Sequence, residues 1–200
     1  MADTHRLFVA VDLNHATREA AADAARAVSA ALARRGPARR VRWVAAEQLH
    51  LTLAFMGAVP DPQMAAVTAA LAPPMPVEAF TLELSGLGMF PAAGPPRVLW
   101  IGVGAGRQAL DGLAAEVGRR LQDAGVLMDD RVWNAHLTIG RWRESRGDDR
   151  AIVSAAAPHG SIGRCPVDHV TLYESTRLAD GPHHTALVRS PLGRPAGGER

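Results

Sequence analysis

The sequence predicts an α+β fold in which two similar, pseudo-symmetric lobes face one another across a central cleft. Each lobe is expected to be a mainly antiparallel sheet with helices on its outside. Short segments rich in β-forming residues alternate with longer segments whose apolar residues recur at helical spacing. The order strand, helix, histidine-containing strand, helix, strand then occurs twice in the 200 residues, with an offset of about ninety residues. A glycine- and proline-rich segment separates the two passages.

The first passage begins with a strand at residues 6–11, which read Arg-Leu-Phe-Val-Ala-Val and have the composition of a buried strand. A helix is expected over residues 16–35, because Asn14 or Thr17 can cap its start and Gly36-Pro37 can end it.

The histidine strand of this passage is Leu49-His50-Leu51-Thr52-Leu53. The next helix should begin at Asp61-Pro62, because aspartate is a favoured N-cap and proline is favoured at the first helical position. Residues 76–82 complete the passage as a strand.

The second passage repeats these elements in the same order. Its first helix should span residues 107–124 and end at Gly125, because Leu110, Leu113, Ala114, Val117 and Leu121 recur at helical spacing. The other expected elements are a strand at 97–103, the histidine strand Ala135-His136-Leu137-Thr138-Ile139, a helix capped by Asp148 or Asp149, a strand at 166–172 and a closing strand at about 185–189.

We therefore expect a single bilobal catalytic domain at residues 1–190, with internal repeats at about 6–95 and 97–190. Residues 86–96 and 143–149 are the predicted linkers, and residues 191–200 are the predicted disordered tail.

Composition places the chain among ordinary globular proteins, with 48% hydrophobic and 21% charged residues. The single cysteine, Cys165, excludes an internal disulfide and suits a reducing compartment. No apolar run has the length of a signal segment or a membrane span, so we expect a cytoplasmic protein that does not bind membranes.

All 22 basic residues are arginines, although the net charge is only +2. Arginine offers planar, bidentate donors that suit phosphate. The charge pattern therefore indicates a modest local preference for acidic partners. The two densest clusters are Arg34, Arg35, Arg39, Arg40 and Arg42, and Arg141, Arg143, Arg146 and Arg150.

The two histidine strands carry the chemistry. Residues two apart in a strand point to the same side, so His50 shares a face with Thr52, and His136 with Thr138. If the repeat implies approximate two-fold symmetry, the two faces meet at the axis. Two groups that exchange protons near neutral pH and two hydroxyls then converge.

Such a site suits hydrolysis of a cyclic phosphodiester, which needs a base for water and an acid for the leaving alkoxide. One neutral and one protonated histidine supply both groups. Threonine hydroxyls and a nearby arginine, for which Arg141 is the best candidate, would stabilise charge on the non-bridging oxygens. This scheme needs no metal and no cofactor.

Other interpretations are weaker. A zinc site would need a third ligand at a recognisable spacing, and the chain has neither HExxH nor a cysteine pair. Gly102, Gly104 and Gly106 have the wrong spacing for a dinucleotide-binding loop. Among the other histidines, His169 is expected to be packed or partly exposed in a strand; His5, His15, His159, His183 and His184 are expected on the surface or in loops.

The paired motifs resemble those of the 2H phosphoesterase superfamily, and more closely the bacterial RNA 2′,3′-cyclic phosphodiesterases, also called 2′-5′ RNA ligases. The likeness covers nearly the whole chain and fades after Arg143. It includes Arg6-Leu7-Phe8-Val9-Ala10-Val11, Leu49-His50-Leu51-Thr52-Leu53-Ala54-Phe55-Met56-Gly57, Gly88-Met89-Phe90-Pro91, Pro96-Arg97-Val98-Leu99-Trp100 and His136-Leu137-Thr138-Ile139-Gly140-Arg141.

The resemblance implies hydrolysis of RNA 2′,3′-cyclic phosphate ends to a 2′-phosphate, and the reverse reaction would be 2′-5′ ligation. It assigns His50 and His136 to catalysis, and Thr52, Thr138 and Arg141 to phosphate binding. Phe55 would stack on the terminal base, although a core position suits it equally. We favour His136 as the base and His50 as the acid, an order that the sequence leaves open.

Two alternative functions remain at this point. One is an RNA-end-binding module without turnover, and the other is a hydrolase of a small nucleotide cyclic phosphate. The intact pair of histidines argues against the first. The expected partners are RNA ends or oligonucleotides with a 2′,3′-cyclic phosphate, without an obligatory protein partner, and we expect a monomer.

Overall fold

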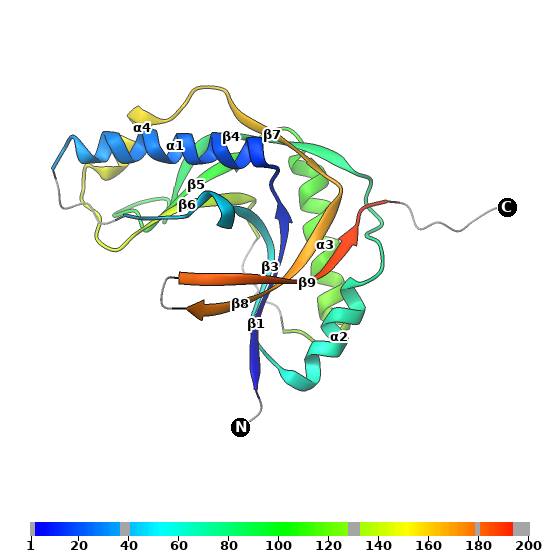
Figure 1. Ribbon diagram of the computed structural model, residues 1–200. Coiled ribbons are helices and arrows are strands. Elements are labelled where there is room, and N and C mark those ends of the chain that lie inside the picture. The colour runs from blue at the N-terminus through cyan, green and yellow to red at the C-terminus, as the bar shows by residue number, and fades with distance from the viewer. Residues whose placement is uncertain (1–2, 37–40, 128–132, 179–180, 194–200) are drawn as a thin grey trace.

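The computed structural model describes residues 3–36, 41–127, 133–178 and 181–193, which form two antiparallel sheets (Figure 1). The strands of the first sheet are β1 (Thr4–Asp12), β3 (His50–Pro60), β8 (His169–Leu178) and β9 (Gly181–Pro191). Those of the second are β2 (Val41–Trp43), β4 (Phe80–Phe90), β5 (Val98–Val103), β6 (His136–Trp142) and β7 (Ser161–Val167). Their spatial orders are β3-β1-β8-β9 and β2-β6-β5-β4-β7.

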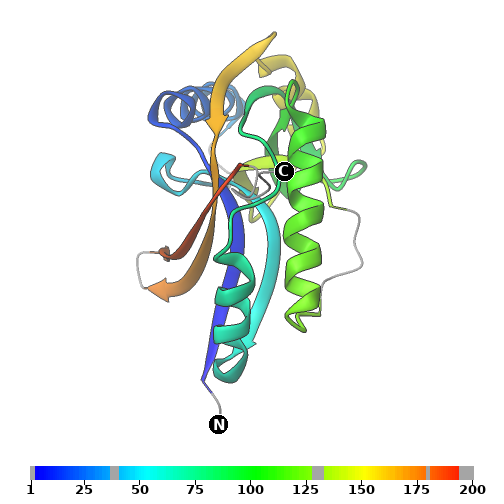
Figure 2. The same cartoon turned by 90° about the vertical axis from the view of Figure 1, so that its right-hand side faces the viewer.

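The helices cover the sheets from outside. They are α1 (His15–Ala33), α2 (Asp61–Leu71), α3 (Arg107–Asp123) and α4 (Asp149–Ala156), with a short 3₁₀ turn, η1 (Ala46–Gln48). Helices α1 and α4 pack against the second sheet, and α2 and α3 against the first (Figures 1 and 2). The predicted α+β class with two similar sheets and outer helices is confirmed.

Neither sheet consists of one half of the sequence. Strand β8, from the second passage, pairs with β1, whereas β4, from the first passage, pairs with β5. Helix α1 follows β1 in the chain but lies on the opposite sheet. The two passages of the chain therefore exchange strands and helices, and their cores are continuous with one another.

The linker predicted at residues 86–96 is wrong in its first part, because β4 continues to Phe90. Glycine in this segment serves packing rather than flexibility. A Cβ atom on Gly88 would lie 2.1 Å from Cζ2 of Trp100, which is paired with Gly88 across the sheet. The glycine thus makes room for an indole ring.

The strand predicted at residues 166–172 is in fact the end of β7 and the start of β8. The chain passes from the second sheet to the first at Asp168. The segment has no strong turn signal, so its sequence reads as one strand. The elements β2, η1 and the first part of β7 were not predicted.

Helix ends follow capping rules with small differences from the prediction. The Asn14 side chain accepts a hydrogen bond from the Thr17 backbone amide at 2.8 Å and so caps α1. Gly125 follows α3 in the left-handed region at φ 77°. The N-cap of α2 is Pro60, one residue before the predicted Asp61.

The core is built from both sheets. Residues Leu7–Val11 of β1 are all buried, as expected for a central strand. The helical stripe predicted for α3 is also buried, and its members Leu110, Leu113 and Leu121 are fully so.

The disordered tail predicted from Pro191 is wrong for its first residues. Strand β9 includes Pro191, and the Leu192 backbone amide donates to the Asp168 carbonyl at 2.7 Å. Leu192 also bridges to Met75. The rest of the predicted tail, residues 194–200, lies outside the described residues.

Candidate active site

The two histidine strands lie beside one cavity of about 260 Å³ between the sheets. His50 and Thr52 enter it from β3, and His136, Thr138 and Arg141 enter it from β6. The structure therefore brings together five of the six residues singled out from the sequence. The cavity is completed by Arg42, Trp43, Val44, Gln48, Pro182 and His184.

A β-bulge explains why Arg141 reaches the cavity. In a regular strand, residues five apart point to opposite faces, which would turn Arg141 away from His136. On β6, Thr138 and Gly140 pair with consecutive residues of β5, so Ile139 is an extra residue. A bulge of this kind shifts the alternation by one position. It returns Arg141 to the face of His136 and Thr138.

The other histidine strand has a bulge at the matching place. Thr52 and Ala54 pair with consecutive residues of β1, so Leu53 is the extra residue. Three residues after Thr52 comes Phe55, which stands where β6 carries Arg141. The two motifs thus share their geometry but end in different side chains, one aromatic and one cationic.

Each of the two imidazoles is hydrogen-bonded to a backbone carbonyl two residues before it in the chain. Nδ1 of His50 lies 2.7 Å from the Gln48 carbonyl oxygen, and Nδ1 of His136 lies 2.7 Å from the Asn134 carbonyl oxygen. A carbonyl only accepts, so Nδ1 carries the hydrogen in both rings. Nε2 of each ring is then free to accept a proton when the ring is neutral and to donate when it is charged.

His50 lies in the more enclosed part of the site. Its ring stacks on Phe8 with 4.8 Å between centroids and meets the His184 ring edge-on at 5.5 Å. Burial lowers the pKa of His50, and the neighbouring His184 acts in the same direction. The hydrogen bond to Gln48 opposes this shift. The neutral imidazole of His50 is therefore favoured in the free protein.

Aromatic side chains also pack around His136. The Phe90 ring meets it edge-on at 5.1 Å, and the Trp100 ring lies at 6.3 Å. Trp100 is the indole for which Gly88 leaves room. The packing of β4 on β5 thus supports the position of this imidazole.

His184 is a site residue that sequence analysis missed. The sequence predicts a surface or loop position for it, but it lines the cavity from β9 and packs against Phe8 and His50. Its Nδ1 is buried and has no hydrogen-bond partner among the described residues. Burial lowers its pKa, and the adjacent His183 adds to this effect. No local pattern marked His184, because its neighbours come from two other strands.

A partly buried carboxylate, Asp12, lies close to His50. Asp12 accepts hydrogen bonds from the Tyr173 hydroxyl at 2.6 Å, the Thr171 hydroxyl at 2.8 Å and Nε2 of His169 at 3.2 Å. Burial alone would raise the pKa of Asp12, but these donors outweigh it and lower the pKa. In turn, burial and Asp12 raise the pKa of Tyr173 to about 12.

The predicted arginine clusters contribute unequally. Arg42 and Arg141 line the cavity, whereas Arg34, Arg35, Arg143, Arg146 and Arg150 do not line it. Arg39 and Arg40 lie outside the described residues.

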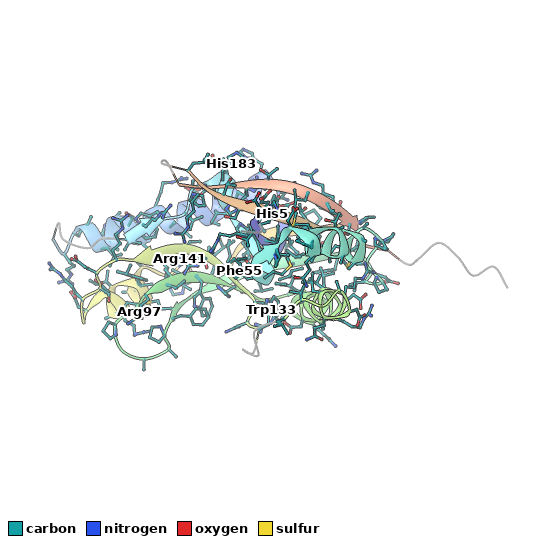
Figure 3. All side chains as sticks on the ribbon, turned by 90° about the horizontal axis from the view of Figure 1, so that it is seen from below. His5, Phe55, Arg97, Trp133, Arg141 and His183 are labelled. Carbon is teal, nitrogen blue, oxygen red and sulfur yellow. The ribbon has the colours of Figure 1, made fainter. Side chains whose placement is uncertain are left out.

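Phe55 lies outside the cavity, beside a larger groove of about 830 Å³ that adjoins it at Thr52 and His136. Phe55 is 53% exposed, which rules out the core position considered from the sequence. Trp133 lines the same groove, near Phe55 in the view of Figure 3, and its Nε1 donates to the Thr52 carbonyl at 3.1 Å. The groove therefore begins at the two histidine strands and has aromatic side chains along it.

No group of three or more His, Cys, Asp or Glu side chains among the described residues is placed to hold a metal ion. None of the helices in the described ranges is long and apolar enough to cross a membrane.

Comparison with known proteins agrees with this geometry. A curated relative from Archaeoglobus fulgidus, named RNA 2′,3′-cyclic phosphodiesterase, is 32% identical over 182 residues, which cover 91% of this chain and 97% of the relative. The crystal structure of TT0787 of Thermus thermophilus matches with a TM-score of 0.73 at 28% identity, over 95% of this chain and 99% of that chain. The crystal structure of E. coli LigT complexed with 3′-AMP matches with a TM-score of 0.70 at 26% identity, over 96% and 99%.

The family model of the 2′-5′ RNA ligase superfamily matches residues 15–178, which include both histidine strands. With this match and the relatives at similar length, the chain belongs to the 2′-5′ RNA ligase superfamily.

Proposed function

We propose that this protein hydrolyses 2′,3′-cyclic phosphate ends of RNA to 2′-phosphates. The observation that carries the proposal is the matched pair of imidazoles, each with Nδ1 bonded to a backbone carbonyl and both lining one cavity. Two such rings provide the base and the acid that opening of a cyclic phosphodiester needs. The names of the relatives point to the same reaction.

In the proposed mechanism, Nε2 of neutral His136 takes a proton from water as the water oxygen attacks phosphorus. The bond between phosphorus and the 3′ oxygen breaks, and Nε2 of protonated His50 gives its proton to that oxygen. The product is a 2′-phosphate with a free 3′-hydroxyl. With the 5′-hydroxyl of another RNA in place of water, the same transfers would join two ends through a 2′-5′ linkage.

The burial of His50 affects its proposed role as the acid, because an acid must be protonated before it can donate. Because its pKa is lowered, His50 is favoured as the neutral ring before substrate binds. An anionic phosphate beside the ring favours its charged form. In this mechanism, substrate binding thus favours the protonated form of His50, which can then act as the acid.

Thr52, Thr138 and Arg141 are the proposed phosphate ligands, because all three line the cavity with the histidines. Hydroxyl donors and a guanidinium aimed at the non-bridging oxygens would stabilise charge that grows in the transition state. Phe55 is the proposed stacking partner of the terminal base, since it is an exposed ring on the groove that continues from the reacting centre.

A cytoplasmic location is part of the proposal. The chain's one cysteine is a buried free thiol, which suits a reducing compartment. The proposed partners are RNA ends rather than another protein.

The test is incubation of the pure protein with an oligonucleotide that ends in a 2′,3′-cyclic phosphate, with and without EDTA. We expect a 2′-phosphate product under both conditions, and no product from a His50→Ala/His136→Ala control. Binding without turnover would indicate an RNA-end-binding module. Activity on a nucleoside cyclic phosphate but not on RNA would indicate a hydrolase of small nucleotides. Loss of activity in EDTA that one divalent ion restores would contradict the metal-independent mechanism.

A further inference from the structure

Arg42 is a cationic residue that lines the cavity but takes no part in the proposed mechanism. It lies on β2, the edge strand beside β6, and pairs directly with Arg141 across the two strands. Like charges directly opposite one another destabilise a sheet. Neither arginine forms an ion pair with a carboxylate among the described residues. The pair is therefore a local cost to folding that a bound anion would offset.

The lining of the cavity also favours an anion with more than one charge. Among the described residues that form its wall, none is acidic, whereas two are arginines and three are histidines. The proposed reaction needs one guanidinium, that of Arg141, at the cyclic phosphate. The charge of Arg42, which lies beside Arg141, then has no partner in the proposed reaction.

The position of Arg42 suits the phosphate next to the reacting one. Its strand lies one strand spacing outside β6, about 4.8 Å away. The Arg42 guanidinium reaches the start of β9, where Nη2 would lie 3.3 Å from a Cβ built on Gly181. The backbone beyond Gly181 is held in turn by Gln48, whose Nε2 donates to the Pro182 carbonyl at 2.7 Å. Arg42 thus stands where the edge of the second sheet meets the start of β9, next to the proposed phosphate ligand Arg141.

We propose that Arg42 forms a second phosphate subsite, which binds the phosphate at the 5′ position of the terminal nucleotide. In an RNA this group is the phosphodiester that joins the terminal nucleotide to the preceding one. The inference rests on the proposed function and deepens it, because it makes an RNA end a better substrate than a nucleoside cyclic phosphate. Arginine suits this task because its planar fork binds phosphate bidentately.

The experiment compares three substrates that share one base: a nucleoside 2′,3′-cyclic phosphate, the same compound with a 5′-phosphate, and a dinucleotide with the cyclic phosphate at its 3′ end. For the wild type, we expect kcat/KM to rise about tenfold or more when a 5′ phosphate group is present. Arg42→Gln should bring that ratio close to one, and Arg42→Lys should give an intermediate ratio. Arg26→Gln is the matched control, because Arg26 is an exposed arginine of α1 that does not line the cavity.

Binding provides a readout that does not depend on turnover. A nucleoside 2′,5′-bisphosphate should bind more tightly than the 2′-phosphate to the wild type and to Arg26→Gln, but not to Arg42→Gln. A ratio near one for the wild type, or the same loss in both arginine variants, would overturn the second subsite. Absence of hydrolysis with all three substrates, with the binding difference retained, would instead overturn the proposed function and leave the subsite standing.

Discussion

At the scale of single residues, the two histidines have the same backbone tether but different surroundings. His50 lies between Phe8 and His184, whereas His136 lies beside Phe90 and Trp100 and also lines the larger groove. Equal tethers hold both rings in the same tautomer. Burial lowers the pKa of His50, and tuning of a pKa by the local environment is how enzymes fit one residue type to different acid–base roles.

The order of acid and base can be tested with the leaving group. A p-nitrophenyl phosphodiester loses a leaving group that needs no proton, so it does not require the acid. On a cyclic phosphate, His50→Ala and His136→Ala should each lose about 10²–10⁴-fold in kcat. On the p-nitrophenyl ester, His50→Ala should recover most of its loss relative to the wild type, and His136→Ala should not. Recovery by His136→Ala instead would reverse the assigned roles.

The lowered pKa of His50 also predicts a dependence of stability on pH. In the unfolded chain the pKa of histidine is about 6.5, and burial lowers it in the folded protein. Between these two values the unfolded state binds more protons, so this contribution to stability is complete above about pH 6.5 and is lost as the pH falls. In urea titrations at pH 7.5 and 5.5, His50→Gln should lose less unfolding free energy than the wild type does. Equal losses in the two proteins would show that His50 is not desolvated in the folded state.

At the scale of elements, the site depends on strand irregularities. The bulges at Leu53 and Ile139 turn Phe55 and Arg141 towards the same side as the histidines that precede them. A bulge shifts which residues face the core without a change of fold. The histidine strand β6 can thereby present a cation to the cavity, while β3 presents an aromatic ring to the groove.

Gly88 tests the packing between β4 and β5. Gly88→Ala would place a Cβ 2.1 Å from the Trp100 ring, so we expect a loss of about 1–3 kcal/mol in unfolding free energy from overpacking. Because Trp100 lies near His136, kcat should fall as well. The control is Gly112→Ala in α3, where the added methyl meets nothing within 4 Å; alanine there should stabilise the helix by about 1 kcal/mol.

A second substitution shows whether the Gly88→Ala effect acts through the indole. In a double-mutant cycle by urea denaturation, Trp100→Leu should make Gly88→Ala much less damaging. Additive losses would mean that the added methyl perturbs the backbone of β4 rather than the Trp100 ring.

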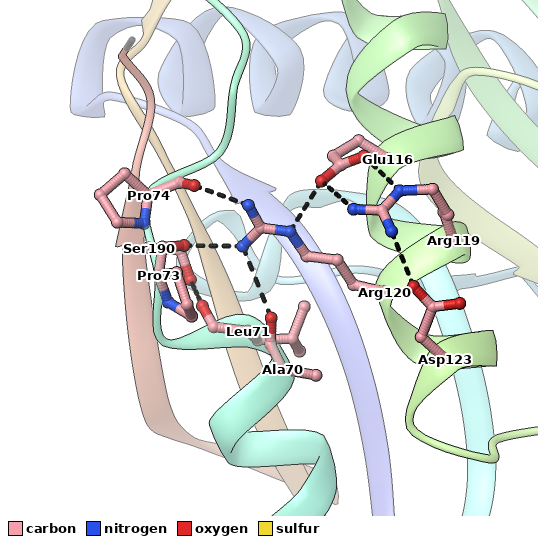
Figure 4. Close-up of polar contacts among 9 residues, drawn as sticks. All are labelled: Ala70, Leu71, Pro73, Pro74, Glu116, Arg119, Arg120, Asp123 and Ser190. Atoms are coloured by element: carbon pink, nitrogen blue, oxygen red, sulfur yellow. Dashed lines mark hydrogen bonds and ion pairs between the residues drawn. The ribbon is translucent and has the colours of Figure 1, made fainter. Parts of the chain in front are cut away.

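At the scale of the whole molecule, the exchange of strands and helices makes the two sheets depend on each other. Helix α3 follows β5 of the second sheet but covers the first sheet together with α2. Arg120 ties these two helices together (Figure 4). Its guanidinium donates to the Pro73 carbonyl at 2.7 Å and the Pro74 carbonyl at 2.6 Å, while Nε donates to Glu116 at 2.8 Å. These donors satisfy carbonyls just beyond the end of α2, where no further helical turn follows to supply a partner.

Loss of this contact should lower stability without a direct effect on chemistry. Arg120 is only 12% exposed, so Arg120→Met should leave polar groups unsatisfied and cost about 1–3 kcal/mol of unfolding free energy. Arg119, which pairs with the same Glu116, is 60% exposed, and Arg119→Gln should cost about 0–1 kcal/mol. Urea denaturation gives both values, and kcat on a cyclic phosphate should stay close to that of the wild type. Equal costs for the two variants would contradict a bridging role of Arg120.

The sequence by itself determined the local features of this protein. It determined the helix at residues 107–124 within one residue, a cap for the first helix at Asn14 or Thr17, and two histidine strands whose motif residues share a face. These features follow from helical periodicity, capping chemistry and the two-residue period of strands, all of which act between near neighbours in the chain. The fold class followed from the repeat, because two copies of one unit bury their apolar faces in the same way.

Only the tertiary structure decided which strands meet. In the folded protein, β4 and β8 each pair with strands from the other passage of the chain, and the histidine strands have bulges at Leu53 and Ile139. Arg42 and His184 also reach the cavity only in the folded protein. Each of these depends on pairing between segments that lie tens to more than a hundred residues apart, as with His50 and His184. Strand pairing is stabilised by cross-strand contacts and by burial of the finished sheet, so the sequence of one strand does not specify its neighbour.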